Sequence, residues 1–163
     1  MRWMRAFALF VAGIIVGIFI MQPSAASPQK VAGLRLNHVG IYVKDLNESI
    51  NFYTKNMGFR EAFSFNDREG RPTHYLQINR DTFLELAPAD ANHLAGVSHM
   101  GIWADDLKST VIALRQRGVK VDDLMLGVTK APLTNLMDPN GVRVELLDFA
   151  PESLQRKAID NWK

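Results

Sequence analysis

Two histidines and two glutamates recur at matching positions in the two halves of the chain. His38 recurs 61 positions later as His99, and Glu85 recurs 60 positions later as Glu145. Neutral imidazoles and ionised carboxylates are groups with which proteins bind divalent cations. A cation would also remove much of the free-energy cost of burying two carboxylates beside two imidazoles. These four residues therefore predict one divalent metal site. The alternative is a metal-free polar cup with a hydrogen-bonded His–Glu network.

The residues around these positions are repeated as well. Residues 37–46 (NHVGIYVKDL) match 98–107 (SHMGIWADDL), and residues 83–86 (FLEL) match 143–146 (RVEL). A repeat of this length indicates that the domain consists of two copies of one supersecondary unit.

Each copy has the pattern of a β-α-β-β-β unit. An alternating apolar strand opens the copy, and an amphipathic helix follows it. In the first copy Asp45 is the expected N-cap and Gly58 the expected end of that helix. Asp105 or Asp106 and Gly118 take the same places in the second copy. The remaining strands are expected near residues 60–65, 73–78 and 82–87 of the first copy, and near 120–122, 134–137 and 142–148 of the second.

The predicted fold class is α+β, with two tandem βαβββ modules that form a curved, cup-shaped mixed sheet with helices outside. Module one is expected to cover residues 34–88, and module two residues 97–149. A flexible lead-in, residues 27–33, precedes them. Residues 150–163 are expected to form a helical tail, with Pro151 in its first turn.

Alternation along the strands places the four predicted ligands on one face of the sheet. The other face carries aliphatic residues or Met, as needed to pack under a helix. These are Val39, Ile41 and Val43, Leu84 and Leu86, Met100, Ile102 and Ala104, and Val144 and Leu146. Positions two residues away share the face of the ligands. We expect that face to carry the substrate-binding residues Tyr42, Phe83, Trp103 and Arg143. For the three aromatic residues, packing in the core is the alternative.

The first 26 residues are typical of a secretory signal peptide. Arg2 and Arg5 precede an apolar run over residues 6–21, and small residues around Ala26 suit a signal peptidase. The run is shorter than the roughly 20 residues that a membrane-spanning helix needs. The signal predicts a periplasmic or secreted protein without stable membrane association, and an uncleaved membrane anchor is the alternative.

Composition argues against several function classes. The chain has 19 Lys and Arg against 17 Asp and Glu. Removal of residues 1–26 takes away Arg2 and Arg5 and no acidic residue, which leaves 17 against 17. A neutral chain without a basic stripe argues against nucleic acid as a partner. Because the sequence contains no Cys, disulfides, thiolate metal ligands and a Cys nucleophile are excluded.

These motifs resemble those of the vicinal oxygen chelate superfamily. It includes glyoxalase I, methylmalonyl-CoA epimerase, extradiol dioxygenases, and the fosfomycin and bleomycin resistance proteins. The resemblance extends over residues 34–149. It rests on His38 and Gly40, Asp45-Leu46, Gly58-Phe59, and residues 138–141 (DPNG) before Val144-Glu145-Leu146.

The resemblance implies that His38, Glu85, His99 and Glu145 match the four metal-ligand positions of glyoxalase I. It thereby implies a lyase or isomerase that chelates a small oxygenated substrate on Ni, Co, Zn, Mn or Fe(II). Glu85 or Glu145 would act as the general base. A homodimer is a further expectation, because symmetric dimers are common in this superfamily.

Two other functions stay open at this point. One is an Fe(II) extradiol-type dioxygenase, which would use His38, His99 and Glu145 alone as ligands. For this function His74 is a candidate acid–base group, and a solvated strand residue is the other interpretation. The second function is a non-catalytic protein that sequesters its ligand. His93, between the modules, is expected to be exposed.

Overall fold

The computed structural model describes residue 31 and residues 33–163. The signal peptide predicted for residues 1–26 therefore lies outside the described residues, as does most of the lead-in. Among the residues that are described, no helix has both the length and the apolar character needed to cross a membrane.

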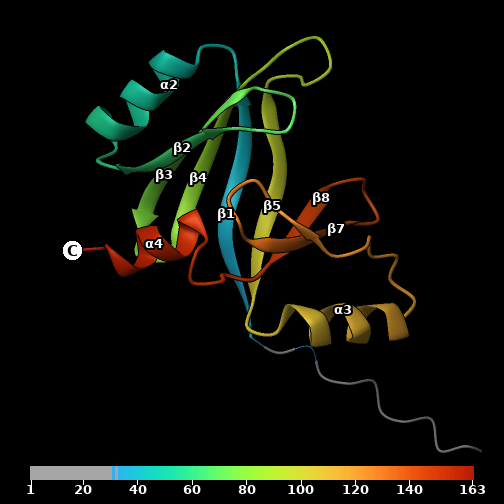
Figure 1. The fold of residues 1–163 in the computed structure, drawn as a ribbon. Coiled ribbons are helices and arrows are strands. Elements are labelled where there is room, and N and C mark those ends of the chain that lie inside the picture. The colour runs from blue at the N-terminus through green and yellow to red at the C-terminus, as the bar shows by residue number, and fades with distance from the viewer. Residues whose placement is uncertain (1–30, 32) are drawn as a thin grey trace, which may run out of the picture.

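One curved, eight-stranded mixed sheet forms the body of the protein (Figure 1), with the strand order β2-β3-β4-β1-β5-β8-β7-β6. Each module pairs its first strand in parallel with its last, and the two first strands pair antiparallel at the centre. The predicted α+β fold with a curved mixed sheet is confirmed. The strands are β1 (Leu34–Val43), β2 (Arg60–Asn66), β3 (Pro72–Asn79), β4 (Thr82–Pro88), β5 (Gly96–Ala104), β6 (Met125–Leu126), β7 (Pro132–Met137) and β8 (Arg143–Leu147).

Module two departs from the expected strands at one place. Residues 120–122 form only an isolated bridge between Val121 and Leu136, and the short strand β6, where no strand was expected, pairs with β7 instead. Nη2 of Arg115 donates hydrogen bonds to the backbone oxygens of Val121 and Asp122 at 2.9 and 2.8 Å. Oγ1 of Thr134 donates a second bond to the oxygen of Asp122 at 2.8 Å, so side chains satisfy much of the backbone of this segment.

The helix of each module covers the convex face of the sheet, as expected. Helix α2 (Leu46–Asn51) continues into a π-helical turn, η1 (Phe52–Asn56), and α3 (Leu107–Gln116) is its counterpart in module two. Asp45 and Asp106 accept the capping hydrogen bonds at the two N-termini. Gly58 and Gly118 follow the two helices with φ of +76° and +79°, a conformation that favours glycine.

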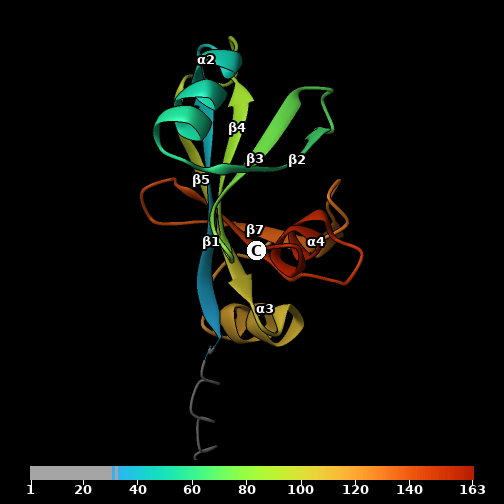
Figure 2. The ribbon, with the colours of Figure 1, turned by 90° about the vertical axis from the view of Figure 1, so that its left-hand side faces the viewer.

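The tail helix lies on the opposite, concave face. Helix α4 (Leu154–Asp160) begins after Ser153, whose side chain caps it, so Pro151 precedes the helix rather than standing in its first turn. Ala158 and Ile159 pack in one core cluster with residues of both modules, which include Phe83 and Leu147. Figure 2 shows α4 on the side of the central strands towards which β2 and β3 curve.

The pairing of β1 with β5 sets two glycines against two histidines. His38 lies opposite Gly101, and Gly40 lies opposite His99. A Cβ atom on Gly101 would stand 2.0 Å from Cε1 of His38, and one on Gly40 would stand 2.2 Å from Cε1 of His99. Each glycine therefore leaves the space that the imidazole of the other module fills.

We expect Gly101→Ala to lower the free energy of unfolding by about 1–3 kcal/mol, because the added methyl group overpacks a buried site and must displace the His38 ring. Urea denaturation measures the change. Val97→Ala, on the same strand but at a side chain 68% exposed, is the control and should change stability by no more than about 0.5 kcal/mol. Equal effects of the two substitutions would contradict the close packing inferred here.

Candidate metal centre

Two rows of residues cross the sheet and carry the predicted ligands. In the Gly40 row, β3, β4, β1, β5 and β8 contribute in turn Tyr75, Glu85, Gly40, His99 and Arg143. In the Gly101 row, β4, β1, β5, β8 and β7 contribute in turn Phe83, His38, Gly101, Glu145 and Asn135. In each row a glycine lies between a histidine of one module and a glutamate of the other.

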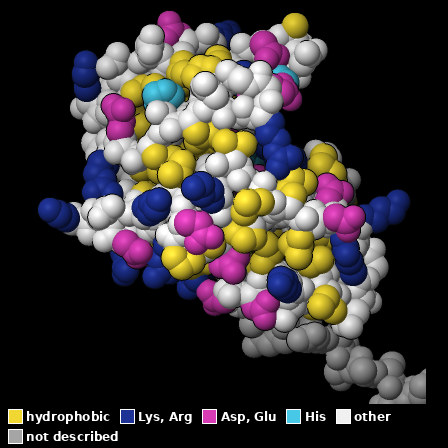
Figure 3. Space-filling view, in the orientation of Figure 1, with side chains coloured by type: hydrophobic (Ala, Val, Ile, Leu, Met, Phe, Trp, Pro, Cys, Tyr) yellow, Lys and Arg dark blue, Asp and Glu magenta, His cyan; other side chains and the backbone are white. Residues whose placement is uncertain are grey.

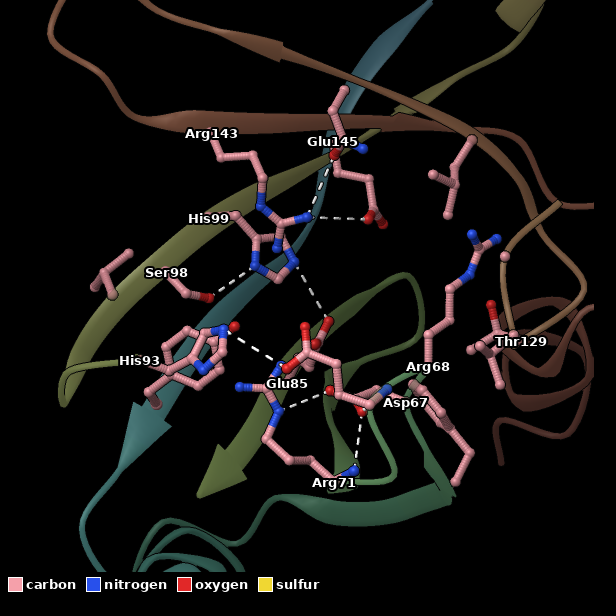
Figure 4. Close-up of a pocket in the computed structure, with 18 of the residues that line it drawn as sticks. Asp67, Arg68, Arg71, Glu85, His93, Ser98, His99, Thr129, Arg143 and Glu145 are labelled. Atoms are coloured by element: carbon pink, nitrogen blue, oxygen red, sulfur yellow. Dashed lines mark hydrogen bonds and ion pairs between the residues drawn. The ribbon is translucent and has the colours of Figure 1, made fainter. Parts of the chain in front are cut away.

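The side chains of the four predicted ligands converge on the concave face. Nε2 of His38 lies 3.0 Å from Nε2 of His99. Oε2 of Glu85 lies 3.5 Å from the first of these nitrogens and 3.4 Å from the second. Oε1 of Glu145 lies 3.7 Å from Nε2 of His38. Figure 4 shows His99 directed towards Glu85, with Arg143 and Glu145 beside it.

Hydrogen bonds behind the imidazoles orient them for metal binding. The amide of Asn37 donates to the backbone oxygen of Asp81 at 2.8 Å, which leaves its Oδ1 to face Nδ1 of His38 at 3.0 Å. Because an amide oxygen only accepts, Nδ1 of His38 carries the proton and Nε2 presents a lone pair to the site. Nδ1 of His99 lies 2.8 Å from Oγ of Ser98.

The donor set fits a divalent cation. The ligand atoms of His38, His99 and Glu145 all lie within 4.8 Å of one another, and Glu85 contacts both imidazoles. With a cation bound, each of these two nitrogens, 3.0 Å apart, would direct a lone pair to it. Imidazole nitrogens held by a partner on the far side of the ring, together with carboxylate oxygens, are typical of protein metal sites.

The surroundings of Glu85 and Glu145 shift their pKa values in opposite directions. Burial raises the pKa of Glu145, and the negative charge of Glu85 raises it further. Burial also acts to raise the pKa of Glu85, but a hydrogen bond from His99, the two imidazole charges and a hydrogen bond from Tyr75 outweigh it and bring that pKa to about 2. Glu85 is therefore ionised at neutral pH, and Glu145 is the carboxylate that more readily takes up a proton.

Tyr75 belongs to the site, although the sequence analysis did not select it. Its hydroxyl donates a hydrogen bond of 2.6 Å to Oε2 of Glu85 and lies 3.4 Å from Nε2 of His38. Burial and the charges of Glu85 and Glu145 raise the pKa of Tyr75 well above its usual value, so the hydroxyl keeps its proton. Strand alternation was the available signal, since positions 73, 75 and 77 share one face.

His74, the neighbouring residue, lies on the other face of the sheet. It stands opposite Leu86, which packs in the core under α2. His74 is therefore separated from the ligands by the sheet, and the acid–base role considered for it is wrong.

A cavity of about 700 Å³ opens at the ligands. Tyr42 and Arg143, both predicted to bind substrate, line it. Nη1 of Arg143 lies 3.8 Å from Oε2 of Glu145. Phe83 and Trp103 share the ligand face, but they pack in the core cluster that includes residues of α4. Core packing was the alternative interpretation of these two aromatic residues.

His93 contributes to the cavity wall, contrary to the expected exposure. Its ring packs against Tyr42 with the centroids 4.9 Å apart, and Nδ1 lies 2.9 Å from Oδ1 of Asp90. The hairpin between β2 and β3 adds Arg68 and Arg71 to the same wall.

On the face shown in Figure 3, basic and acidic side chains are interspersed, in agreement with the absence of a basic stripe in the sequence.

Comparison with known proteins assigns the family. The family model for the glyoxalase/bleomycin resistance protein/dioxygenase superfamily matches residues 35–146, which include all four predicted ligands. The chain belongs to this superfamily. The resemblance inferred from the sequence motifs is confirmed, and members of this superfamily bind a divalent metal.

Individual relatives within the superfamily are distant. A probable chloroplastic lactoylglutathione lyase of Arabidopsis thaliana is 28% identical over 134 residues; the match covers 72% of this chain and 36% of the relative, so the chain spans about a third of that protein. A methylmalonyl-CoA epimerase variant of Streptomyces coelicolor, in complex with 2-nitronate-propionyl-CoA, is 26% identical with a TM-score of 0.65. That match covers 73% of this chain and 96% of the epimerase. The epimerase of Mycobacterium tuberculosis is 25% identical, with a TM-score of 0.64 and coverage of 80% and 95%.

We expect the metal-free protein to lose stability as the pH falls from 6.5 to 4. Burial lowers the pKa of His38 from 6.5 to about 4, so in this range the unfolded chain binds a proton that the folded protein does not. The loss should reach about 3 kcal/mol at most, and the raised pKa of Glu145 offsets part of it. Urea denaturation of chelator-treated protein between pH 7 and pH 4 measures the slope. His38→Gln should flatten it, and an unchanged slope in that variant would assign the effect to other groups.

Proposed function

We propose that this protein is a divalent-metal-dependent lyase or isomerase of the glyoxalase-like type, which acts on a small oxygenated substrate. The observation that carries the proposal is the convergence of His38, His99, Glu85 and Glu145 at the inner end of the cavity. The similarity to a probable lactoylglutathione lyase and to methylmalonyl-CoA epimerases supports it.

His38, His99, Glu145 and Glu85 would hold the cation. When bound, the cation would supply Lewis acidity to two neighbouring substrate oxygens and so stabilise an enediolate-like charge. The remaining chemistry is the movement of a proton at the substrate carbon, and the two carboxylates are unequal candidates for it.

We assign the proton transfer to Glu145. Tyr75 fixes Glu85 by a hydrogen bond of 2.6 Å, and the pKa of Glu85 is about 2, which makes it a firm ligand and a weak base. Glu145 stands 3.8 Å from Arg143, beyond hydrogen-bonding distance, and its pKa is raised. A general base works best when its pKa approaches the working pH. Tyr42 and Arg143, in the cavity wall, would contact the substrate.

Two expectations from the sequence remain part of this proposal. Residues 1–26 would direct the protein to the periplasm or the exterior, and the mature chain would form a homodimer. Mass spectrometry of the secreted protein and sedimentation analysis test them.

Purified wild-type protein should contain about one divalent metal ion per chain by elemental analysis, because four protein ligands fill most of an octahedral shell. His38→Ala and His99→Ala should each lower the metal content or affinity by at least about tenfold. His74→Ala is the matched control, since this imidazole lies on the convex face. Metal content that does not depend on His38 or His99 would contradict the proposed site.

An Fe(II) dioxygenase is the second candidate, and one observation favours it. The three ligand atoms that lie within 4.8 Å of one another come from His38, His99 and Glu145. Two histidines and one carboxylate are the ligand set of non-haem Fe(II) oxygenases. Glu85 would then stay a neighbour of the metal rather than a ligand.

Glu85→Gln separates the two candidates. In a four-ligand lyase or isomerase it should lower kcat/KM by roughly 10- to 100-fold through weakened metal binding, whereas a three-ligand dioxygenase should keep its activity. Turnover of a glutathione hemithioacetal and of methylmalonyl-CoA, and oxygen uptake with Fe(II) and an aromatic diol, are the assays. Saturable ligand binding in chelator, with no turnover of any substrate by any metal form, would favour the non-catalytic protein instead.

A further inference from the structure

Apolar side chains that are open to solvent line one part of the cavity. We call them the apolar rim: Leu94, Val97, Met125, Val128 and Met137, each more than a third exposed. Single exposed apolar side chains are ordinary on a protein surface, but these five line one concave site. Exposed apolar surface inside a cavity favours a ligand that removes it from water.

The sheet places two residues of the apolar rim beside the metal centre. Met137 pairs with Arg143 and so extends the Gly40 row two positions beyond His99. Val97 precedes His99 by two residues on β5 and lines the cavity with it. Val97 is 68% exposed and Met137 is 58% exposed, whereas His99 is buried. The apolar rim therefore begins directly beside the predicted ligands.

The arginines of the hairpin between β2 and β3 already have partners. Nε of Arg71 lies 2.9 Å from Oδ2 of Asp67 (Figure 4), and its Nη2 lies 3.1 Å from Oε2 of Glu69. Nη2 of Arg68 donates a hydrogen bond to the backbone oxygen of Leu126 at 2.8 Å. A charged ligand would have to compete with these contacts.

The charges along the cavity wall are nearly balanced. Of the described residues that line the cavity, three are Arg, four are Asp or Glu, and none is Lys. A bound divalent cation would turn this deficit of one positive charge into an excess of one. That excess suits a ligand with one ionised oxygen, and it gives little attraction for a ligand with several phosphate or carboxylate groups.

We propose that the substrate has two neighbouring oxygens at one end and an uncharged apolar chain or ring at the other, and that this apolar end lies on the apolar rim. The inference rests on the proposed function for the oxygen end and adds the chemical class of the remainder. A cavity of about 700 Å³ is within the range of pockets that hold drug-sized ligands, so it has room for both ends. Val97 and Met137 are then specificity-determining residues.

Straight-chain hydroxamic acids test the proposal, because their two oxygens chelate Zn²⁺ while the alkyl chain is lengthened one methylene at a time. Acetohydroxamic to hexanohydroxamic acid are titrated into the Zn²⁺-loaded protein by calorimetry. Affinity should rise roughly two- to fourfold per methylene as the chain leaves water. The monohydroxamic acid of adipic acid, with six carbons and a terminal carboxylate, should lose most of this gain. An affinity that does not depend on chain length, or that the terminal carboxylate does not weaken, would overturn the proposal.

A double variant tests the apolar rim itself. Val97→Thr with Met137→Gln nearly keeps the size of both side chains and makes them polar, so the ratio of hexanohydroxamic to acetohydroxamic affinity should fall by at least about fivefold. Ile112→Thr with Met57→Gln makes matched changes at exposed apolar residues outside the cavity and should keep the wild-type ratio. Equal ratios in the two double variants would contradict the assignment.

A second copy of the chain is the competing occupant of the apolar rim. Sedimentation analysis of the wild-type protein and of both double variants distinguishes it. An assembly that dissociates only in Val97→Thr with Met137→Gln, together with a flat hydroxamate series, would assign the rim to contact between copies and overturn the proposal.

1-Hexanol separates failure of this inference from failure of the proposed function, because it has the apolar chain without a chelating group. In chelator-treated protein it should shift the methyl NMR signals of Val97 and Met137 and leave those of Ile112 in place. Unshifted signals would overturn the role of the apolar rim. Acetohydroxamic acid that binds no better to the Zn²⁺-loaded protein than to chelator-treated protein would contradict the proposed metal centre, and the 1-hexanol titration would still decide the role of the rim.

Discussion

The register between β1 and β5 is the constraint on which the rest of the structure depends. It sets His38 against Gly101 and His99 against Gly40, so that each imidazole occupies the space left by a glycine of the other module. A shift by one residue would turn every side chain of β1 to the opposite face. The imidazole of His38 would then leave the cavity while that of His99 stayed, and the aliphatic residues of β1 that pack under α2 would enter it. The metal centre and the two convex cores are therefore fixed by the same pairing.

The sequence predicted most of what this pairing requires, because the repeat carries the relevant residues twice. The four converging ligands, the helix caps and the concave face followed from duplicated positions and from strand alternation. Tyr75 was missed for the same reason. Position 135, which corresponds to Tyr75 in module two, holds Asn, so the repeat did not mark it. Phe83 and Trp103 had the correct face, but the sequence did not show that α4 covers them.

The difference between Tyr75 and Asn135 contributes to the inequality of the two carboxylates. Tyr75 stands next to Glu85 in the Gly40 row and donates a hydrogen bond to it, whereas Asn135 stands next to Glu145 in the Gly101 row and faces Arg143 instead, 3.3 Å from Nη1. The hydrogen bond from His99 and the two imidazole charges lower the pKa of Glu85, and the hydrogen bond from Tyr75 adds to them. Burial and the charge of Glu85 raise the pKa of Glu145. A perfectly symmetric site would hold two equivalent carboxylates.

This inequality has a consequence for catalysis at a chelated substrate. Proton transfer at one carbon needs a base that can leave its resting position, and metal retention needs a carboxylate that stays in place. If the two halves were identical, each carboxylate would have to serve both as a fixed metal ligand and as a mobile base. Substitution at one position of the repeat, Tyr75 against Asn135, allows one carboxylate to hold the cation and the other to move the proton. The repeat thus accounts for the ligand geometry, and the departures from the repeat account for the division of roles that we propose.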